Sequence, residues 1–222
     1  MVDHSPYHTA VTLSHKHLSA AFVAAYAPHK QGPQQERDEV FGRISACVAR
    51  LRGQGWKVYV GIDANANIGS VVSPSVGAHH AQLQCNNGLK LHELVVSADL
   101  ALPQTFSASM IGAGQTWFSS HGGSGRRLDY VAIPVQALAG ATAAVSKDID
   151  LMNPVEDHAP VIVTAAVARK CSRPPCARRL VGYDKFLFAD PQRMASFEAE
   201  VEALPLQPFG MDADSHNHIV VA

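Results

Sequence analysis

The sequence predicts an α/β fold, a layered sandwich of mostly antiparallel strands flanked by helices. Short runs in which apolar and other residues alternate indicate strands, and segments with helical periodicity lie between them. Strand and helix patterns follow one another irregularly, and no internal repeat is visible. We therefore expect antiparallel pairing to dominate, with the helices packed on the sheets.

Length and composition agree with this class. The chain has 222 residues, enough for one domain or one domain plus a tail. Apolar residues make up 47% and charged residues 17%, as in globular proteins. The net charge of -1 indicates no global attraction to a polyanion, although it does not exclude a local patch. No segment resembles a signal peptide or a membrane span, so we expect a soluble, intracellular protein without a membrane partner.

The four cysteines do not suggest a disulfide framework in a chain of this size. Cys47 lies on an apolar helical face and is interpreted as a core residue. Cys171 and Cys176 flank Ser-Arg-Pro-Pro, but no second ligand pair with zinc-site spacing accompanies them. Their role stays open.

The chain begins with polar, histidine-rich sequence, and residues 1–18 are predicted to be irregular or disordered. A partial domain is expected over residues 19–168. Its first strand is the apolar run 19–26, which ends at Tyr26 because the following Ala-Pro pair disfavours helix. A helix is predicted over 34–52, since its apolar residues fall on one face that can cover a sheet.

A second strand is predicted over residues 57–63, where buried-type residues alternate and end on Asp63. The polar segment that follows includes Asn65 and favours a turn. A carboxylate and an amide at the mouth of an apolar strand suggest a site, and an Asx-rich turn without function is the alternative.

The rest of the chain supplies shorter elements. Asn87-Gly88 opens a predicted helix, residues 99–105 form a brief strand and turn, and strands are predicted at 116–118, 126–133 and 161–167. Residues 169–189 read as a basic, proline-containing linker, and 190–222 as a connector helix and tail.

Polar side chains are expected to gather at one edge of the sheet. Tyr26 and Asp63 end their strands, whereas Asp129 and the Asp157-His158 pair precede or begin theirs. In antiparallel neighbours these opposite ends meet. The predicted rim comprises Tyr26, Asp63, Asn65, Asp129, Asp157 and His158.

Such a rim suits metal-assisted hydrolysis of a phosphate ester. Clustered carboxylates repel one another unless a cation joins them, and oxygen ligands favour Mg²⁺ or Mn²⁺. A carboxylate beside an imidazole orients it and favours its protonated form, which can stabilise an oxyanion or move a proton.

Four motifs, in order, resemble those of the endonuclease/exonuclease/phosphatase superfamily. They are YAP at 26–28, GIDANAN at 61–67, RRLDYV at 126–131 and EDHAP at 156–160. The likeness is greatest to the apurinic-type endonuclease domain of non-LTR retrotransposon polyproteins, which the segment 87–94 also resembles.

The resemblance implies a role for each rim residue. Asp63 would activate or position the attacking water and contact the metal, Asn65 would orient the water or the phosphate, and Tyr26 would hydrogen-bond a phosphate oxygen. Asp129 would orient His158, which would stabilise the transition-state charge.

Asp157 would contact the metal or a neighbouring proton. Two residues depart from the family pattern: Glu156 replaces a serine, and Ala64 replaces a bulky residue.

The resemblance covers residues 19–167, and nothing before Tyr26 matches the family's first strands, which carry an Asn and the principal metal-binding Glu. The domain is therefore expected to lack its N-terminal part, as in an incomplete gene model or a degenerate element copy. We expect a sheet edge left unpaired, weak metal binding if any, and severely reduced turnover.

The functional hypothesis is Mg²⁺-dependent phosphodiester hydrolysis on DNA by endonuclease-type nicking, impaired by the absent segment. A small-molecule or lipid phosphatase of the same superfamily and a noncatalytic remnant or binding protein are the alternatives, so enzymatic activity stays open. DNA is the expected partner, and an ancestral reverse transcriptase domain is expected after the C-terminus.

Overall fold

The computed structural model describes residues 2–15, 18–29, 31–119, 124–146, 149 and 157–166, together with 191–192, 194–196 and 199. The chain divides into two compact units, Met1–Cys171 and Ser172–Ala222. In the second unit the described residues are helical. The predicted linker, Cys171 and Cys176 lie outside the described residues. Within the described part, no helix is long and apolar enough to cross a membrane.

The first unit is built on a six-stranded sheet with the order β1-β2-β3-β4-β7-β5. Its strands are β1 (Val2–Ser5), β2 (His8–His15), β3 (Leu18–Tyr26), β4 (Lys57–Asp63), β5 (Leu100–Ala101) and β7 (Asp129–Pro134). Only β3 and β4 pair in parallel among these described strands; the other neighbours are antiparallel. The predicted α/β class with mostly antiparallel strands is confirmed.

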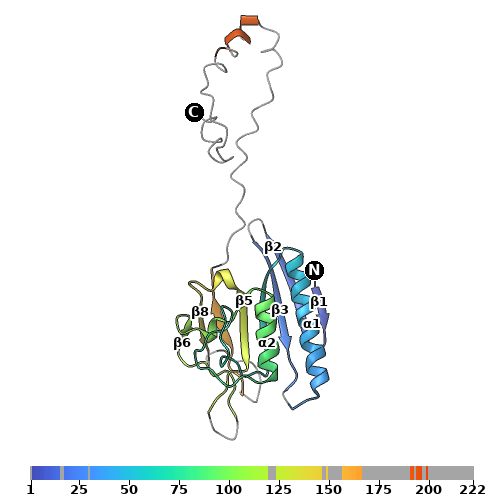
Figure 1. Ribbon diagram of the computed structural model, residues 1–222, viewed down its shortest axis with the longest axis vertical. Coiled ribbons are helices and arrows are strands. Elements are labelled where there is room, and N and C mark those ends of the chain that lie inside the picture. The colour runs from blue at the N-terminus through green and yellow to red at the C-terminus, as the bar shows by residue number, and fades with distance from the viewer. Residues whose placement is uncertain are drawn as a thin grey trace. The chain divides into compact units, whose positions relative to one another are not determined.

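Two helices, α1 (Gln34–Gly53) and α2 (Asn86–Ser97), pack on one face of this sheet (Figure 1). The face of α1 that the periodicity predicts is buried, from Val40 to Leu51, and packs against Val58, Val60 and Ile62 of β4. The buried face of α2 carries Leu91, Leu94 and Val95, which belong to the same core. The core therefore lies between the helices and the alternate residues of the strands.

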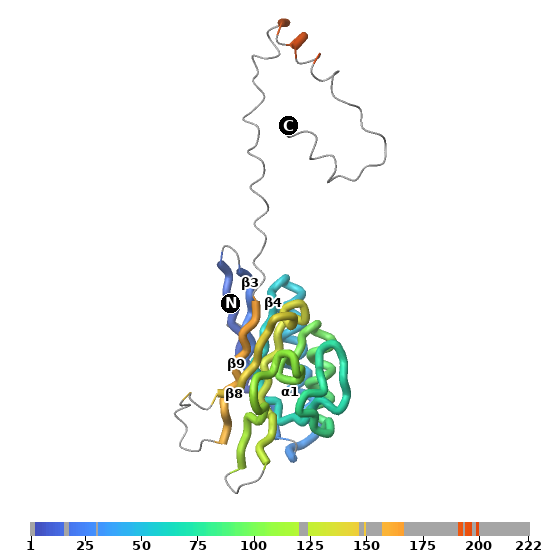
Figure 2. The backbone as a smooth tube through the Cα atoms, turned by 90° about the vertical axis from the view of Figure 1, so that its left-hand side faces the viewer, coloured from blue at the N-terminus to red at the C-terminus, as the bar shows by residue number. Residues whose placement is uncertain are grey.

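A second sheet has the order β6-β8-β9. Its strands are β6 (Met110–Ile111), β8 (Thr142–Val145) and β9 (Val161–Thr164). The short 3₁₀ helix η1 (Pro103–Thr105) contacts β6 and β8, and a second one, η2 (Val135–Ala137), directly follows β7. β9 lies next to β7, and Figure 2 shows β8 and β9 on the side of the first sheet away from α1. Two layers of strands and one of helices result.

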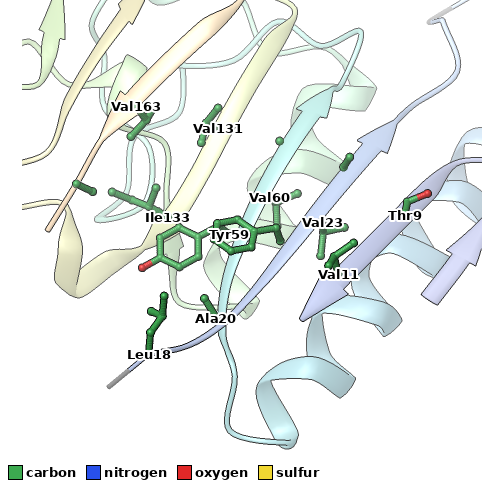
Figure 3. A pocket seen from close by; sticks show the side chains of 14 residues that line it. Thr9, Val11, Leu18, Ala20, Val23, Tyr59, Val60, Val131, Ile133 and Val163 are labelled. Atoms are coloured by element: carbon green, nitrogen blue, oxygen red, sulfur yellow. The ribbon is translucent and has the colours of Figure 1, made fainter. Parts of the chain in front are cut away.

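The face of the first sheet opposite the helices carries an apolar cavity of about 450 Å³ (Figure 3). Val11 of β2, Tyr59 of β4, Ile133 of β7 and Val163 of β9 line it. Phe22, which also lines it, stacks on Tyr59 with ring centroids 5.4 Å apart, yet it remains 47% exposed. The second sheet therefore leaves part of this face uncovered.

One expectation about the N-terminus is wrong. Residues 2–15 are not irregular, because β1 and β2 form an antiparallel hairpin and β2 pairs with β3 from His8↔Ala25 to His15↔Leu18. β3 is therefore paired on both sides, and a sheet edge left unpaired by the absent segment stays a prediction. The polar, histidine-rich composition favoured an irregular segment, although the residues around Val11 are β-branched or apolar, which is typical of a strand.

The strand expected at 116–118 is also wrong. Trp117 makes only isolated bridges among the described residues, to Arg126 and to His158. The pattern around Trp117 therefore indicates extended backbone, but the residue belongs to no strand ladder.

A close approach of backbones explains the Asn87-Gly88 pair at the start of α2. A Cβ on Gly88 would lie 1.9 Å from the carbonyl oxygen of Asn67. We expect Gly88→Ala to lower the free energy of unfolding by about 1–3 kcal/mol, because the loop that carries Asn67 must move. Gly42 of α1 has no such neighbour within 4 Å, so Gly42→Ala should raise stability by about 0.5–1 kcal/mol. Urea unfolding of both variants checks the contrast, and equal effects would contradict it.

Candidate active site

Three of the predicted residues form a row across neighbouring strands. Tyr26 of β3 is paired with Asp63 of β4, and Asp63 is paired with Asp129 of β7. Residues paired across strands project from the same face of a sheet. The ends of β3 and β4 and the beginning of β7 therefore present a phenol and two carboxylates side by side.

His158 joins this row from the segment just before β9. Its Nδ1 lies 2.9 Å from Oδ2 of Asp129. Asp63, Asp129 and His158 each offer a ligand atom within 4.8 Å of the others. These three residues define the active-site cluster.

The polar segment after β4 is both an Asx-type turn and a part of the candidate site. The Asn65 amide N–H donates to Oδ1 of Asp63 at 3.0 Å, which is an Asx-type turn. Asn65 has a positive φ of 45°, and its side-chain amide donates to the Ala27 carbonyl at 3.0 Å. The turn therefore holds the Asp63 carboxylate in place, and Oδ1 is the atom that Asn65 can offer to a ligand.

The Asn87 side chain holds this turn in place through hydrogen bonds. Its buried side-chain amide donates to the carbonyl oxygens of Pro28 at 3.0 Å, Ala64 at 3.1 Å and Asn65 at 3.3 Å. Helix α2 thus fixes the ends of both β3 and β4. The sequence marked Asn87 only as part of a helix start and a family resemblance.

Thr116 holds the other half of the cluster, and sequence reasoning missed it. Its Oγ1 accepts from the backbone N–H groups of Leu128 and Asp129, each at 3.0 Å. Its carbonyl oxygen accepts from the N–H of Ala159 at 2.7 Å. This fully buried threonine therefore ties the start of β7 to the residue after His158.

Asp157 lies outside the active-site cluster. Its Oδ2 accepts from the indole N–H of Trp117 at 3.3 Å, and its carbonyl oxygen accepts from the N–H of Phe118 at 2.7 Å. These bonds orient the segment that carries His158. A role for Asp157 as a metal ligand stays a prediction.

Two small cavities meet at His158. Asp63, Asp129 and His158 line one of about 220 Å³. The other, of about 120 Å³, is lined by His29, Asn65, Asn67, Trp117, Arg126 and His158. His29, when protonated, acts on the Asp63 carboxylate, and Arg126 contributes a guanidinium to the wall of the smaller cavity. Both were missed as site residues, although Arg126 lies within a quoted motif and His29 directly follows one.

The surroundings of Asp63 give its carboxylate a higher proton affinity than an ordinary aspartate has. Burial raises the pKa of this carboxyl, and the nearby charge of Asp129 raises it further. The hydrogen bond from the Asn65 N–H, His158 and His29 oppose this shift without cancelling it. Asp63 is therefore a stronger base than an ordinary aspartate.

The donor set fits a hard divalent cation only in part. Asp63 and Asp129 supply carboxylate oxygens, which Mg²⁺ and Mn²⁺ prefer. One Asp129 oxygen is already engaged by His158, and Nδ1 of that histidine is engaged as well. Mg²⁺ retains several waters when few protein ligands are present, so the described residues could hold it loosely.

Asp63→Asn should stabilise the protein at neutral pH. Because the folded pKa is raised, the folded state binds this proton more tightly than the unfolded chain does. Stability is therefore lost as pH rises through the raised pKa. We expect a higher Tm for Asp63→Asn than for the natural chain at neutral pH, and no advantage below pH 3.8, where both states bind the proton. Thermal unfolding across pH tests this, with the exposed Glu93→Gln as control.

Thr116→Val should loosen the cluster. The substitution keeps the shape but leaves two partly buried N–H groups without their acceptor, at a combined cost of about 1–3 kcal/mol. Denaturant unfolding measures the loss. The exposed Thr142→Val of β8 serves as control, and an equally small effect at both positions would contradict the role of Thr116.

Comparisons with known proteins agree on the fold. No family model and no curated protein matches the sequence. Among solved structures, the 3′-5′ exonuclease NExo from Neisseria meningitidis is similar, with 16% identity and a TM-score of 0.52 over 72% of this chain and 64% of that one. The chain thus spans less than two thirds of NExo.

Two further structures match similarly. The 3′ phosphatase NExo from Neisseria, bound to product DNA hairpin, gives 16% identity and a TM-score of 0.54 over 74% of this chain and 66% of that one. The endonuclease domain of TRAS1, a telomere-specific non-LTR retrotransposon, gives 14% identity and a TM-score of 0.50, over 75% of this chain and 69% of that one. These matches show that the chain shares the fold of these nucleases, in agreement with the fold class predicted from the sequence.

Proposed function

We propose that this chain hydrolyses phosphodiester bonds in DNA as a divalent-metal-dependent endonuclease. The observation that carries the proposal is the juxtaposition of Asp63 with the hydrogen-bonded pair Asp129–His158 at one rim. Nucleases and a phosphatase among the structural neighbours support phosphoester hydrolysis in general.

Asp63 is the base for the attacking water in this proposal. Its raised pKa improves proton acceptance, and its held Oδ1 leaves the second carboxylate oxygen to meet the water. The cavity of about 220 Å³ beside it provides room for a water and a phosphate group.

His158 stabilises the negative charge that develops on the phosphate. The Asp129 carboxylate accepts a hydrogen bond from Nδ1–H and so orients the ring, and Nε2 donates to the phosphate when the ring carries its second proton. Tyr26, half-exposed and in the same row, donates its hydroxyl to a phosphate oxygen. Asn65 orients the water or the phosphate through Oδ1.

A bound Mg²⁺ or Mn²⁺ would polarise the phosphate and offset the charges of the two aspartates. Asp63 and Asp129 would hold it. With so few protein ligands we expect weak affinity and slow turnover, which follows from the described donors. Asp157 as a further ligand, and a reverse transcriptase domain as a partner, remain predictions.

Plasmid nicking by the full chain tests the proposal. We expect slow conversion of supercoiled to open-circular DNA that needs Mg²⁺ or Mn²⁺ and falls by at least about 10²-fold in Asp63→Asn and in His158→Gln. Glu93→Gln on α2, outside both cavities, should keep the wild-type rate. Circular dichroism checks that each variant is folded.

Two outcomes would replace this proposal. Release of phosphate from a 3′-phosphorylated DNA end or an inositol phosphate, without nicking, would make the chain a phosphatase. No metal-dependent turnover of any of these substrates, in a folded protein, would make it a noncatalytic binding protein.

A further inference from the structure

A second cluster of metal-binding side chains lies where the N-terminal hairpin packs on α1. Asp3 of β1, His8 of β2 and Cys47 of α1 each offer a ligand atom within 4.8 Å of the others. None of them belongs to the active-site cluster. We propose that Asp3, His8 and Cys47 bind a zinc ion that clamps the hairpin to the helix.

His8 is already held in the orientation of a metal ligand. The ring is 7% exposed, and its Nδ1 lies 2.8 Å from Oγ of Ser5. Oγ of Ser5 also accepts from the backbone N–H groups of Tyr7 and His8, so its hydroxyl can donate to Nδ1 in the metal-free protein. Zinc binding at Nε2 requires the imidazole proton on Nδ1, facing the same oxygen. Zinc-binding histidines are fixed in this manner by a partner on the opposite nitrogen.

The spacing of the donors suits a tetrahedral ion. Nε2 of His8 lies 3.8 Å from Oδ2 of Asp3, too far for a hydrogen bond. Bonds of about 2.0–2.3 Å to tetrahedral zinc place neighbouring ligand atoms roughly 3.3–3.8 Å apart. A small contraction around an ion therefore completes the site, with water as the fourth ligand.

Cys47 supplies the donor that selects the metal. Its side chain is 3% exposed, and burial together with the hydrogen bond to Asp3 raises the pKa of the thiol. Zinc takes the thiolate, so binding releases the thiol proton and strengthens as pH rises. One thiolate, one imidazole and one carboxylate favour zinc over Mg²⁺, which prefers oxygen ligands.

Arg50 is the competitor for this position. Its Nη2 contacts Oδ2 of Asp3 and lies 3.8 Å from Sγ of Cys47. The side chain is 44% exposed, so it can move into solvent when an ion arrives. The Arg50 guanidinium thus lies beside Asp3 and Cys47, where it competes with a metal ion, and substitution of Arg50 should favour zinc binding.

Cobalt titration of the full chain tests the site, because Co²⁺ bound to a thiolate gives a charge-transfer band in the near ultraviolet. Cys171→Ser/Cys176→Ser is the background, which removes the two cysteines outside the described residues. We expect the band at one equivalent, its displacement by Zn²⁺, and a Tm that rises with Zn²⁺ concentration.

The variants assign the ligands. Cys47→Ser should abolish the band, whereas Cys85→Ser, which removes the other described cysteine, should keep it. Asp63→Asn should also keep it, which separates this site from the active-site cluster. Arg50→Gln should tighten zinc binding about two- to fivefold, the worth of a surface ion pair.

The opposite results overturn the proposal. These are the absence of a thiolate band, a band that survives Cys47→Ser, or unchanged or weaker zinc binding in Arg50→Gln. Should Cys47→Ser fail to fold, Asp3→Asn takes its place, and zinc affinity must then fall at least about tenfold.

Discussion

The structure depends on the way β4 is paired on both of its sides. Parallel pairing with β3 sets Tyr26 against Asp63, and antiparallel pairing with β7 sets Asp129 against Asp63. A shift of one residue in either ladder would turn the partner's side chain to the opposite face of the sheet. The register of three strands, more than any single contact, therefore creates the candidate active site.

The surroundings then give the two aspartates different tasks. Asp129 is bonded to His158, whereas Asp63 is held by the Asn65 N–H and takes up a proton more readily. Like charges at short range disfavour ionisation of both groups together. One carboxylate thus orients an imidazole while the other remains available as a base.

The polar turn after β4 shows that a structural and a functional interpretation need not exclude each other. The Asp63 side chain makes an Asx-type turn with Asn65, and the same turn fixes the carboxylate that enters the cluster. Asn87 adds three hydrogen bonds to carbonyl groups beneath it. Rigidity of the turn is therefore a condition for the geometry of the site.

The sequence by itself determined the elements whose signal is local: the strands that end at Tyr26 and Asp63, the helix over 34–52, and the α/β class. Period and turn chemistry are properties of adjacent residues, so they can be read without partners. The hairpin within residues 2–15 had a local signal around Val11, but its pairing with β3 is visible only in the structure. Only the tertiary structure decided that Thr116 holds Asp129 and that Asp157 faces Trp117. These two contacts join segments distant in the chain, and a hydrogen bond across such a distance leaves no periodic trace in the sequence.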